Sequence, residues 1–138
     1  MSPFPFSQPL PQGPLRVTLL TPVLSSCVTA ESERFVAYFK ANPQVYVEFC
    51  RLAEQMRVER QLLKYSSDVL FHVLRWHRDL KTTDADYTIN NDHNAYFARA
   101  YMHHYDCPRW FESRKSKADI VEWPTQHRGI LRGKLPVI

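Results

Sequence analysis

The stretch from Ser66 to Tyr105 constrains the fold of this chain more than any other, because it combines helical periodicity, helix caps and aromatic anchors. Apolar residues recur at helical spacing in its first part, and a polar break follows. A second helical pattern begins after Asn90–Asp92. This order of helix, short extended segment and helix is compatible with a small DNA-binding fold. No residue set within the stretch completes a known catalytic or metal-binding pattern.

Two further helices are expected before this stretch. Thr29 can cap the first helix, since acidic residues in the following turn interact favourably with the helix dipole. Asn42 and Pro43 predict a restart, with Asn as the cap and Pro at the first helical position. The apolar face of this second helix comprises Val45, Tyr46, Phe49, Leu52, Ala53 and Met56.

The helices within the Ser66–Tyr105 stretch have equally clear faces. Ser66 or Ser67 is expected to cap the third helix, and Trp76 is expected to anchor the core. The fourth helix should end before Pro108. The apolar stripe of the third helix comprises Val69, Leu70, Val73, Leu74, Trp76 and Leu80. The fourth helix presents Tyr96, Phe97, Ala100, Tyr101 and His104.

The predicted fold class is mainly α: one small domain of about four helices with a minor two-stranded β ribbon, in an arrangement similar to a winged helix. Tyr87–Ile89 is expected to pair with Trp110–Ser113 in the ribbon. Residues 1–28 form a proline-rich extended arm, residues 29–114 the helical domain and residues 115–138 a basic, flexible tail. Within the arm, Leu15–Val28 is apolar enough to dock along the domain or a partner.

Composition and charge limit the class of protein. The chain has 138 residues, with 18 Lys and Arg against 14 Asp and Glu, which gives a net charge of +4. No run approaches the roughly 18–20 apolar residues that span a bilayer, so we expect no membrane partner. The 3 cysteines contain no CxxC pair, and the first residues lack an export signal, which favours a cytoplasmic location.

A nucleic-acid site is the leading interpretation of the basic residues. Arg and Lys side chains neutralise phosphates, and Arg can also contact guanine edges. Asp68 and Asp79 on the third helix argue against it, because carboxylates repel phosphates. The candidate residues for DNA or RNA binding are Arg75, Arg78, Lys81, Arg99, Arg114, Lys115 and Lys117.

Metal and enzyme chemistry have weaker support. The histidines His103 and His104 are adjacent, so on a helix they point about 100° apart and cannot face one ion. Phosphate-binding glycine loops and nucleophile elbows are also missing from the sequence. We therefore expect no enzyme activity, no metal and no cofactor. The residues of metal-ligand type in this region are Asp92, His93, His103, His104, Asp106 and Cys107.

A protein partner is the competing interpretation. The apolar segment Leu15–Val28 and the surplus of Phe, Tyr and Trp suit a binding or inhibitory module that targets a host or phage protein. A homodimer is a further alternative. Salt dependence separates the two classes, because nucleic-acid affinity falls steeply as salt rises and an apolar interface is insensitive to it.

Several short motifs resemble those of small proteins encoded by temperate phages and prophages. The resemblance covers roughly residues 35–114 and implies a phage-associated accessory role, without a defined activity or site residue. This chain has Val58, Glu59 and Arg60 where that family suggests a glycine-containing turn. The motifs are Ala41-Asn42-Pro43 with Val45 and Tyr46, Leu74-Arg75-Trp76, Asp86-Tyr87 with Ile89-Asn90-Asn91, Tyr96 with Ala98-Arg99, and Phe111-Glu112 with Arg114.

Overall fold

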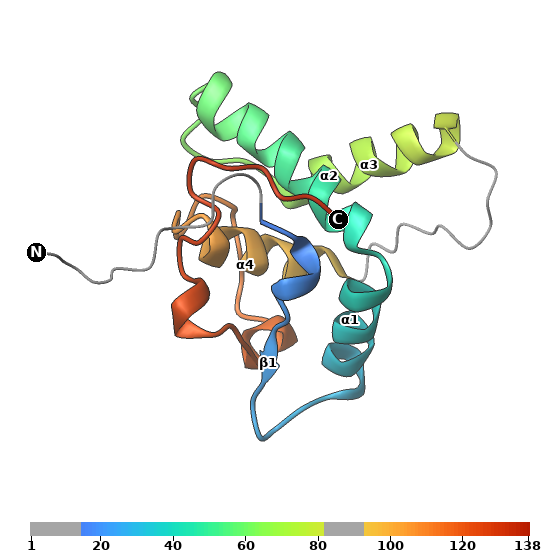
Figure 1. Ribbon diagram of the computed structural model, residues 1–138, viewed down its shortest axis with the longest axis vertical. Helices are drawn as coiled ribbons and strands as arrows, with labels where there is room; N and C mark the ends of the chain where they lie inside the picture. The colour runs from blue at the N-terminus through green and yellow to red at the C-terminus, as the bar shows by residue number, and fades with distance from the viewer. Residues whose placement is uncertain (1–14, 82–92) are drawn as a thin grey trace, which may run out of the picture.

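The computed structural model describes residues 15–81 and 93–138, with side chains described only to residue 78 in the first range. Its four α-helices are α1 (Ala30–Ala41), α2 (Pro43–Glu54), α3 (Ser67–Lys81) and α4 (Asn94–His104). Within these ranges, no helix has the length and hydrophobicity needed to cross a membrane. Figure 1 shows α4 at the centre, with α1 beside it and α2 and α3 crossing above. The mainly helical class is therefore confirmed.

The junction of α1 and α2 follows from local hydrogen bonds. Thr29 Oγ1 accepts from the Ser32 backbone N–H and Ser32 Oγ accepts from the Thr29 N–H, each at 3.1 Å, so the predicted Thr29 cap is confirmed. The Asn42 side chain instead donates to the Tyr38 carbonyl at 3.3 Å. Asn42 occupies the N-cap position of α2, as predicted, but its side chain makes no cap hydrogen bond there because its amide is bonded to the end of α1. Pro43 occupies the first position of α2, as expected.

The second helix does not end in a glycine turn. It continues from α2 into a π-helical turn, η2 (Gln55–Glu59), and the chain then reverses at Gln61, whose φ is +56°. The π-helical turn and the left-handed backbone of Gln61 thus end the helix at the place where the family resemblance suggests a glycine-containing turn. The side chains that α2 buries are Val45, Tyr46, Phe49, Cys50 and Ala53.

Aromatic rings form the centre of the core. Phe97 of α4 is fully buried and its ring packs edge-on against five surrounding rings, at centroid distances of 5.5–6.2 Å. These rings belong to α1, α2 and α3, so one α4 side chain joins all four helices. The predicted α4 face is confirmed, since all five of its residues are buried. The partner rings of Phe97 are Phe35, Phe39, Tyr46, Phe49 and Phe71.

The apolar stripe predicted for α3 is wider than the face that α3 buries. Leu70, Phe71 and Leu74 are buried against the core, but Val69 is 42% exposed and Trp76 is 61% exposed. The prediction that Trp76 anchors the core was therefore wrong. Phe71, on the other side of Leu70, fills the space against Phe49 and Phe97.

The small sheet forms from residues other than those expected. Strands β1 (Val23–Leu24) and β2 (Val121–Glu122) pair antiparallel, with Val23 opposite Glu122. Of the predicted ribbon, Tyr87–Ile89 lies outside the described residues. Trp110–Ser113 forms no strand, and Phe111 makes only an isolated parallel bridge to Tyr65. The expected winged-helix ribbon is therefore not supported.

Both ends of the described chain contribute to the domain. Val17 in the 3-10 helix η1 (Val17–Leu19) is fully buried, and its N–H donates to the Val137 carbonyl at 2.8 Å. Leu131 is also fully buried. The segment expected as a flexible tail instead carries β2 and two 3-10 helices, η4 (Lys117–Ile120) and η5 (Thr125–His127). Its apolar side chains complete the core, which explains the difference.

Candidate functional site

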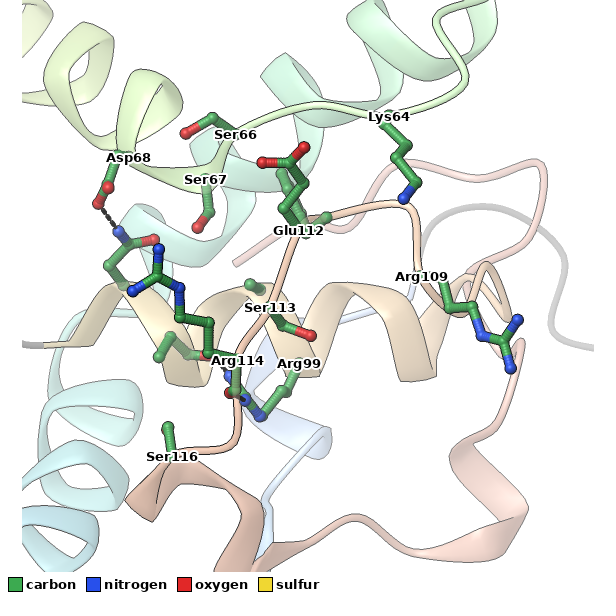
Figure 2. A pocket seen from close by; sticks show the side chains of 14 residues that line it. Lys64, Ser66, Ser67, Asp68, Arg99, Arg109, Glu112, Ser113, Arg114 and Ser116 are labelled. Atoms are coloured by element: carbon green, nitrogen blue, oxygen red, sulfur yellow. Dashed lines mark hydrogen bonds between the residues drawn. The ribbon is translucent and has the colours of Figure 1, made fainter.

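A polar hollow lies between the start of α3, the first half of α4 and the segment 111–116 (Figure 2). Its volume is about 860 Å³. We call it the α3–α4 hollow. Most of its lining side chains are polar or charged, and they come from three separate parts of the chain. The lining comprises Lys64, Ser66, Ser67, Asp68, Asn94, Ala95, Ala98, Arg99, Arg109, Phe111, Glu112, Ser113, Arg114 and Ser116.

Backbone hydrogen bonds join the two loops that line this hollow. The Tyr65 N–H donates to the Trp110 carbonyl at 3.1 Å, and the Glu112 N–H donates to the Tyr65 carbonyl at 3.3 Å. Trp110 Nε1 adds a bond to the Leu62 carbonyl at 2.8 Å. Arg109 has a φ of +68°, which turns the chain back toward α3 after α4 ends. The loop before α3 and the segment after α4 therefore line the same hollow.

The first turn of α3 forms one wall of the hollow. Its leading N–H groups have no acceptor within the helix, as at any helix start. Neither Ser66 nor Ser67 caps them through its hydroxyl in the part of the chain that the structure describes, so the predicted serine cap was wrong. Ser67 is only 9% exposed, and Figure 2 shows its hydroxyl pointing into the hollow. The Asp68 carboxylate accepts a hydrogen bond from the Asn94 amide, which links the starts of α3 and α4.

Arg99 lines the hollow but is already committed to other groups. Its Nε lies 2.6 Å from Asp119 Oδ1, its Nη1 donates to the Ala95 carbonyl at 3.0 Å and its Nη2 donates to the Arg114 carbonyl at 2.7 Å. The Ser116 backbone N–H, together with Arg99, lowers the pKa of Asp119, so the pair stays ionised. Arg99 therefore positions the segment that carries Arg114, and its charge is balanced.

Three other cations of the hollow have no carboxylate partner among the described residues. They are Lys64, Arg109 and Arg114, and all three are exposed. In Figure 2, Arg114 extends across the hollow toward the start of α3, whereas Lys64 and Arg109 lie at the opposite end. The Glu112 carboxylate lies between these two ends. The hollow therefore has a cationic group at each end.

The seven predicted nucleic-acid residues do not form one site. Arg99 and Arg114 line the hollow, while Lys115 and Lys117 are exposed just beyond it. Arg75 and Arg78 lie farther along α3, and the side chain of Lys81 is outside the described residues. Sequence reasoning missed Lys64, Ser67 and Arg109 as site residues. Lys64 and Arg109 lie in loops, which carry no periodic signal, and the pairing of these loops brings them to the same hollow as Ser67 at the start of α3.

The histidines and cysteine that were considered as metal ligands have other roles. The Tyr46 hydroxyl and His104 Nδ1 lie 2.6 Å apart in the core, and His103 Nε2 lies 2.9 Å from the Pro124 carbonyl. Burial raises the pKa of Cys107 to about 11. Within residues 15–81 and 93–138, no group of three or more His, Cys, Asp or Glu side chains is placed to hold a metal ion. Asp92 lies outside the described residues.

Comparison with known proteins adds no assignment: no protein-family model, no curated protein and no solved structure matches this chain. The resemblance to phage and prophage proteins therefore stays a prediction.

Proposed function

We propose that this protein is a non-enzymatic factor that binds single-stranded nucleic acid through the α3–α4 hollow and the adjoining face of α3. The observation that carries this proposal is the set of cations Lys64, Arg109 and Arg114 around one hollow, which have no carboxylate partner in the described part of the chain. Cationic grooves of this kind follow a phosphate backbone without reading sequence. The hollow differs from the surface predicted from sequence, since it uses only Arg114 of those residues as a free cation.

The exposed ring of Trp76 favours a single strand over a duplex. Trp76 is 61% exposed on the helix whose first turn lines the hollow. Nine residues separate it from Ser67, which is about 14 Å along the helix axis. Bases stack on exposed aromatic rings when they are unpaired, and a basic groove beside such a ring is typical of single-strand binders. Nine residues are also about two and a half turns, so Trp76 projects from the side of α3 opposite Ser67, and a strand that contacts both the hollow and Trp76 has to pass around the helix.

A paired set of variants tests this proposal. Arg109→Ala combined with Arg114→Ala removes two cations from the hollow, so the affinity for a fluorescent oligonucleotide should fall and the slope of log K against log salt should decrease by about two. Arg128→Ala combined with Arg132→Ala removes the same charge from a site where both side chains face Asp106. This control should retain most of the affinity. Equal losses in both double variants, or no binding by the unmodified protein at low salt, would rule out the hollow as a nucleic-acid site.

A protein partner is the second candidate, and the exposed apolar face of α3 favours it. Val69 and Trp76 lie seven residues apart, so they share one helix face, and they are 42% and 61% exposed. Exposed Trp side chains often dominate the energy of protein interfaces. Binding that depends on Trp76, persists at high salt and is unaffected by loss of Arg109 and Arg114 would favour this candidate.

A further inference from the structure

The start of α3 combines two features that act on the same ligand. Its first-turn N–H groups have no acceptor within the helix, and the positive end of the helix dipole lies there. Independently, the Ser67 hydroxyl points into the hollow with no hydrogen-bond partner among the described residues, although the side chain is only 9% exposed. The oxygen itself opens into the hollow, so it is free to hydrogen-bond a ligand bound there.

The charges around Ser67 define the sign of that ligand. Arg114 extends toward the start of α3 and has no carboxylate partner among residues 15–78 and 93–138. Of the two carboxylates that line the hollow, Asp68 accepts a hydrogen bond from the Asn94 amide, and Glu112 lies between the two cationic ends of the hollow. Hydroxyl and N–H donors beside a guanidinium suit an anion with several acceptor oxygens.

We infer that the start of α3 is a phosphate-binding seat, formed by its first-turn N–H groups, the Ser67 hydroxyl and the Arg114 guanidinium. This inference rests on the proposed function for its biological ligand, a phosphate of the bound strand. The phosphate can be an internal diester, a terminal monoester or free inorganic phosphate. All three share the same tetrahedral set of oxygen acceptors.

A single substitution separates binding from folding at this seat. Ser67→Asp places a carboxylate in the seat, where it repels phosphate and at the same time favours the helix dipole. Its affinity for an oligonucleotide of about 12 nucleotides should fall about tenfold or more, with no decrease in melting temperature. The matched control is Ser113→Asp, which adds the same charge on the exposed edge of the hollow. It should weaken binding less than about threefold.

Two further measurements identify the source of the phosphate. Oligonucleotides with a 5′-phosphate and with a 5′-hydroxyl are compared by anisotropy, and tighter binding of the phosphorylated strand that Ser67→Asp removes assigns the seat to a terminal phosphate. Equal binding of the two strands, lost in Ser67→Asp, assigns it to an internal phosphate. Separately, inorganic phosphate alone is titrated into the isotope-labelled protein, and the amide resonances of Ser67, Asp68 and Val69 should shift.

The outcomes distinguish this inference from the proposed function. Phosphate-induced shifts at these three amides without oligonucleotide binding would support the seat and reject the nucleic-acid function. Oligonucleotide binding that Ser67→Asp and Ser113→Asp weaken equally would overturn the seat and leave the function in place. Absence of shifts at Ser67–Val69 at saturating phosphate would also overturn the seat.

Discussion

Protonation of His104 would place a charge in the core, because this ring is fully buried. Burial and the neighbouring His103 and His127 hold its pKa well below the ordinary value of 6.5. The ring packs against Tyr46 and Trp123, and its Nδ1 lies 2.6 Å from the Tyr46 hydroxyl. Burial also lowers the pKa of His103 and His127, so the three histidines act in the same direction.

We predict that the protein loses stability as the pH falls below about 6.5, the pKa of histidine in the unfolded chain. Below that value the unfolded chain binds protons that the folded protein excludes, so the free energy of unfolding decreases by up to about 1.4 kcal/mol per pH unit for His104. Above about pH 7.5 these histidines no longer make the free energy of unfolding depend on pH. Chemical denaturation at several pH values measures this. A free energy of unfolding that increases as the pH is lowered from 7 to about 5 would contradict the lowered pKa of these histidines.

Tyr101 connects two charged side chains of the second helix to α4. Its hydroxyl donates to Glu54 Oε1 and accepts from Arg57 Nε at 2.8 Å. Tyr101→Phe leaves both charged groups short of one partner, so it should lower the free energy of unfolding by about 1–3 kcal/mol. Tyr65→Phe is the matched control, because the Tyr65 hydroxyl has no hydrogen bond within the described chain. Its effect should stay below about 0.5 kcal/mol, and equal effects would argue against the network.

At the scale of elements, one face of α3 packs against the core and another face is exposed to solvent. Leu70, Phe71 and Leu74 bind it to the core, while Trp76 and Val69 remain exposed. Its first turn opens into the α3–α4 hollow. A helix that needs only part of its apolar stripe for packing keeps the rest available for a partner.

We predict that Trp76→Ala weakens oligonucleotide binding about fivefold or more, because one base loses its stacking surface. The slope of affinity against salt should not change, since no cation is removed. Leu63→Ala is the control, because Leu63 is 90% exposed and belongs to the loop before α3. Thermal melting should be the same for both variants and the unmodified protein. A large loss of stability in Trp76→Ala alone would restore Trp76 as a core residue.

At the scale of the whole molecule, residues near both ends of the described chain complete one core. Val17 and Leu131 are fully buried, and hydrogen bonds join Leu15 and Val17 to Val137. The helical segment between them therefore depends on contacts from both flanks. A long-range arrangement of this kind predicts cooperative unfolding of the whole unit.

We predict that Leu131→Ala lowers the free energy of unfolding by about 2–5 kcal/mol, because it leaves a cavity in the core. Leu135→Ala removes the same atoms from a side chain that is 45% exposed, so its cost should be below about 1 kcal/mol. Denaturant melts of the two variants provide the comparison. Similar midpoints for both would show that residues 115–138 do not belong to the cooperative core.

The sequence by itself determined the four helices and most of the aromatic side chains that fill the space between them, with Phe71 as an exception. The Thr29 cap, the Pro43 start of α2 and the buried face of α4 depend on contacts a few residues apart, which local patterns encode. Even there, the Asn42 side chain could either accept from the first N–H groups of α2 or donate to the Tyr38 carbonyl, and sequence could not decide between the two.

Only the tertiary structure decided which charged residues share a surface. Arg99 is balanced by Asp119, 20 residues away, and Lys64 and Arg109 reach one hollow through the pairing of Tyr65 with Phe111. Trp76 is exposed because Phe71 occupies the position against the core. These outcomes depend on how separate segments pack against one another, and side-chain periodicity within one segment contains no information about its partner.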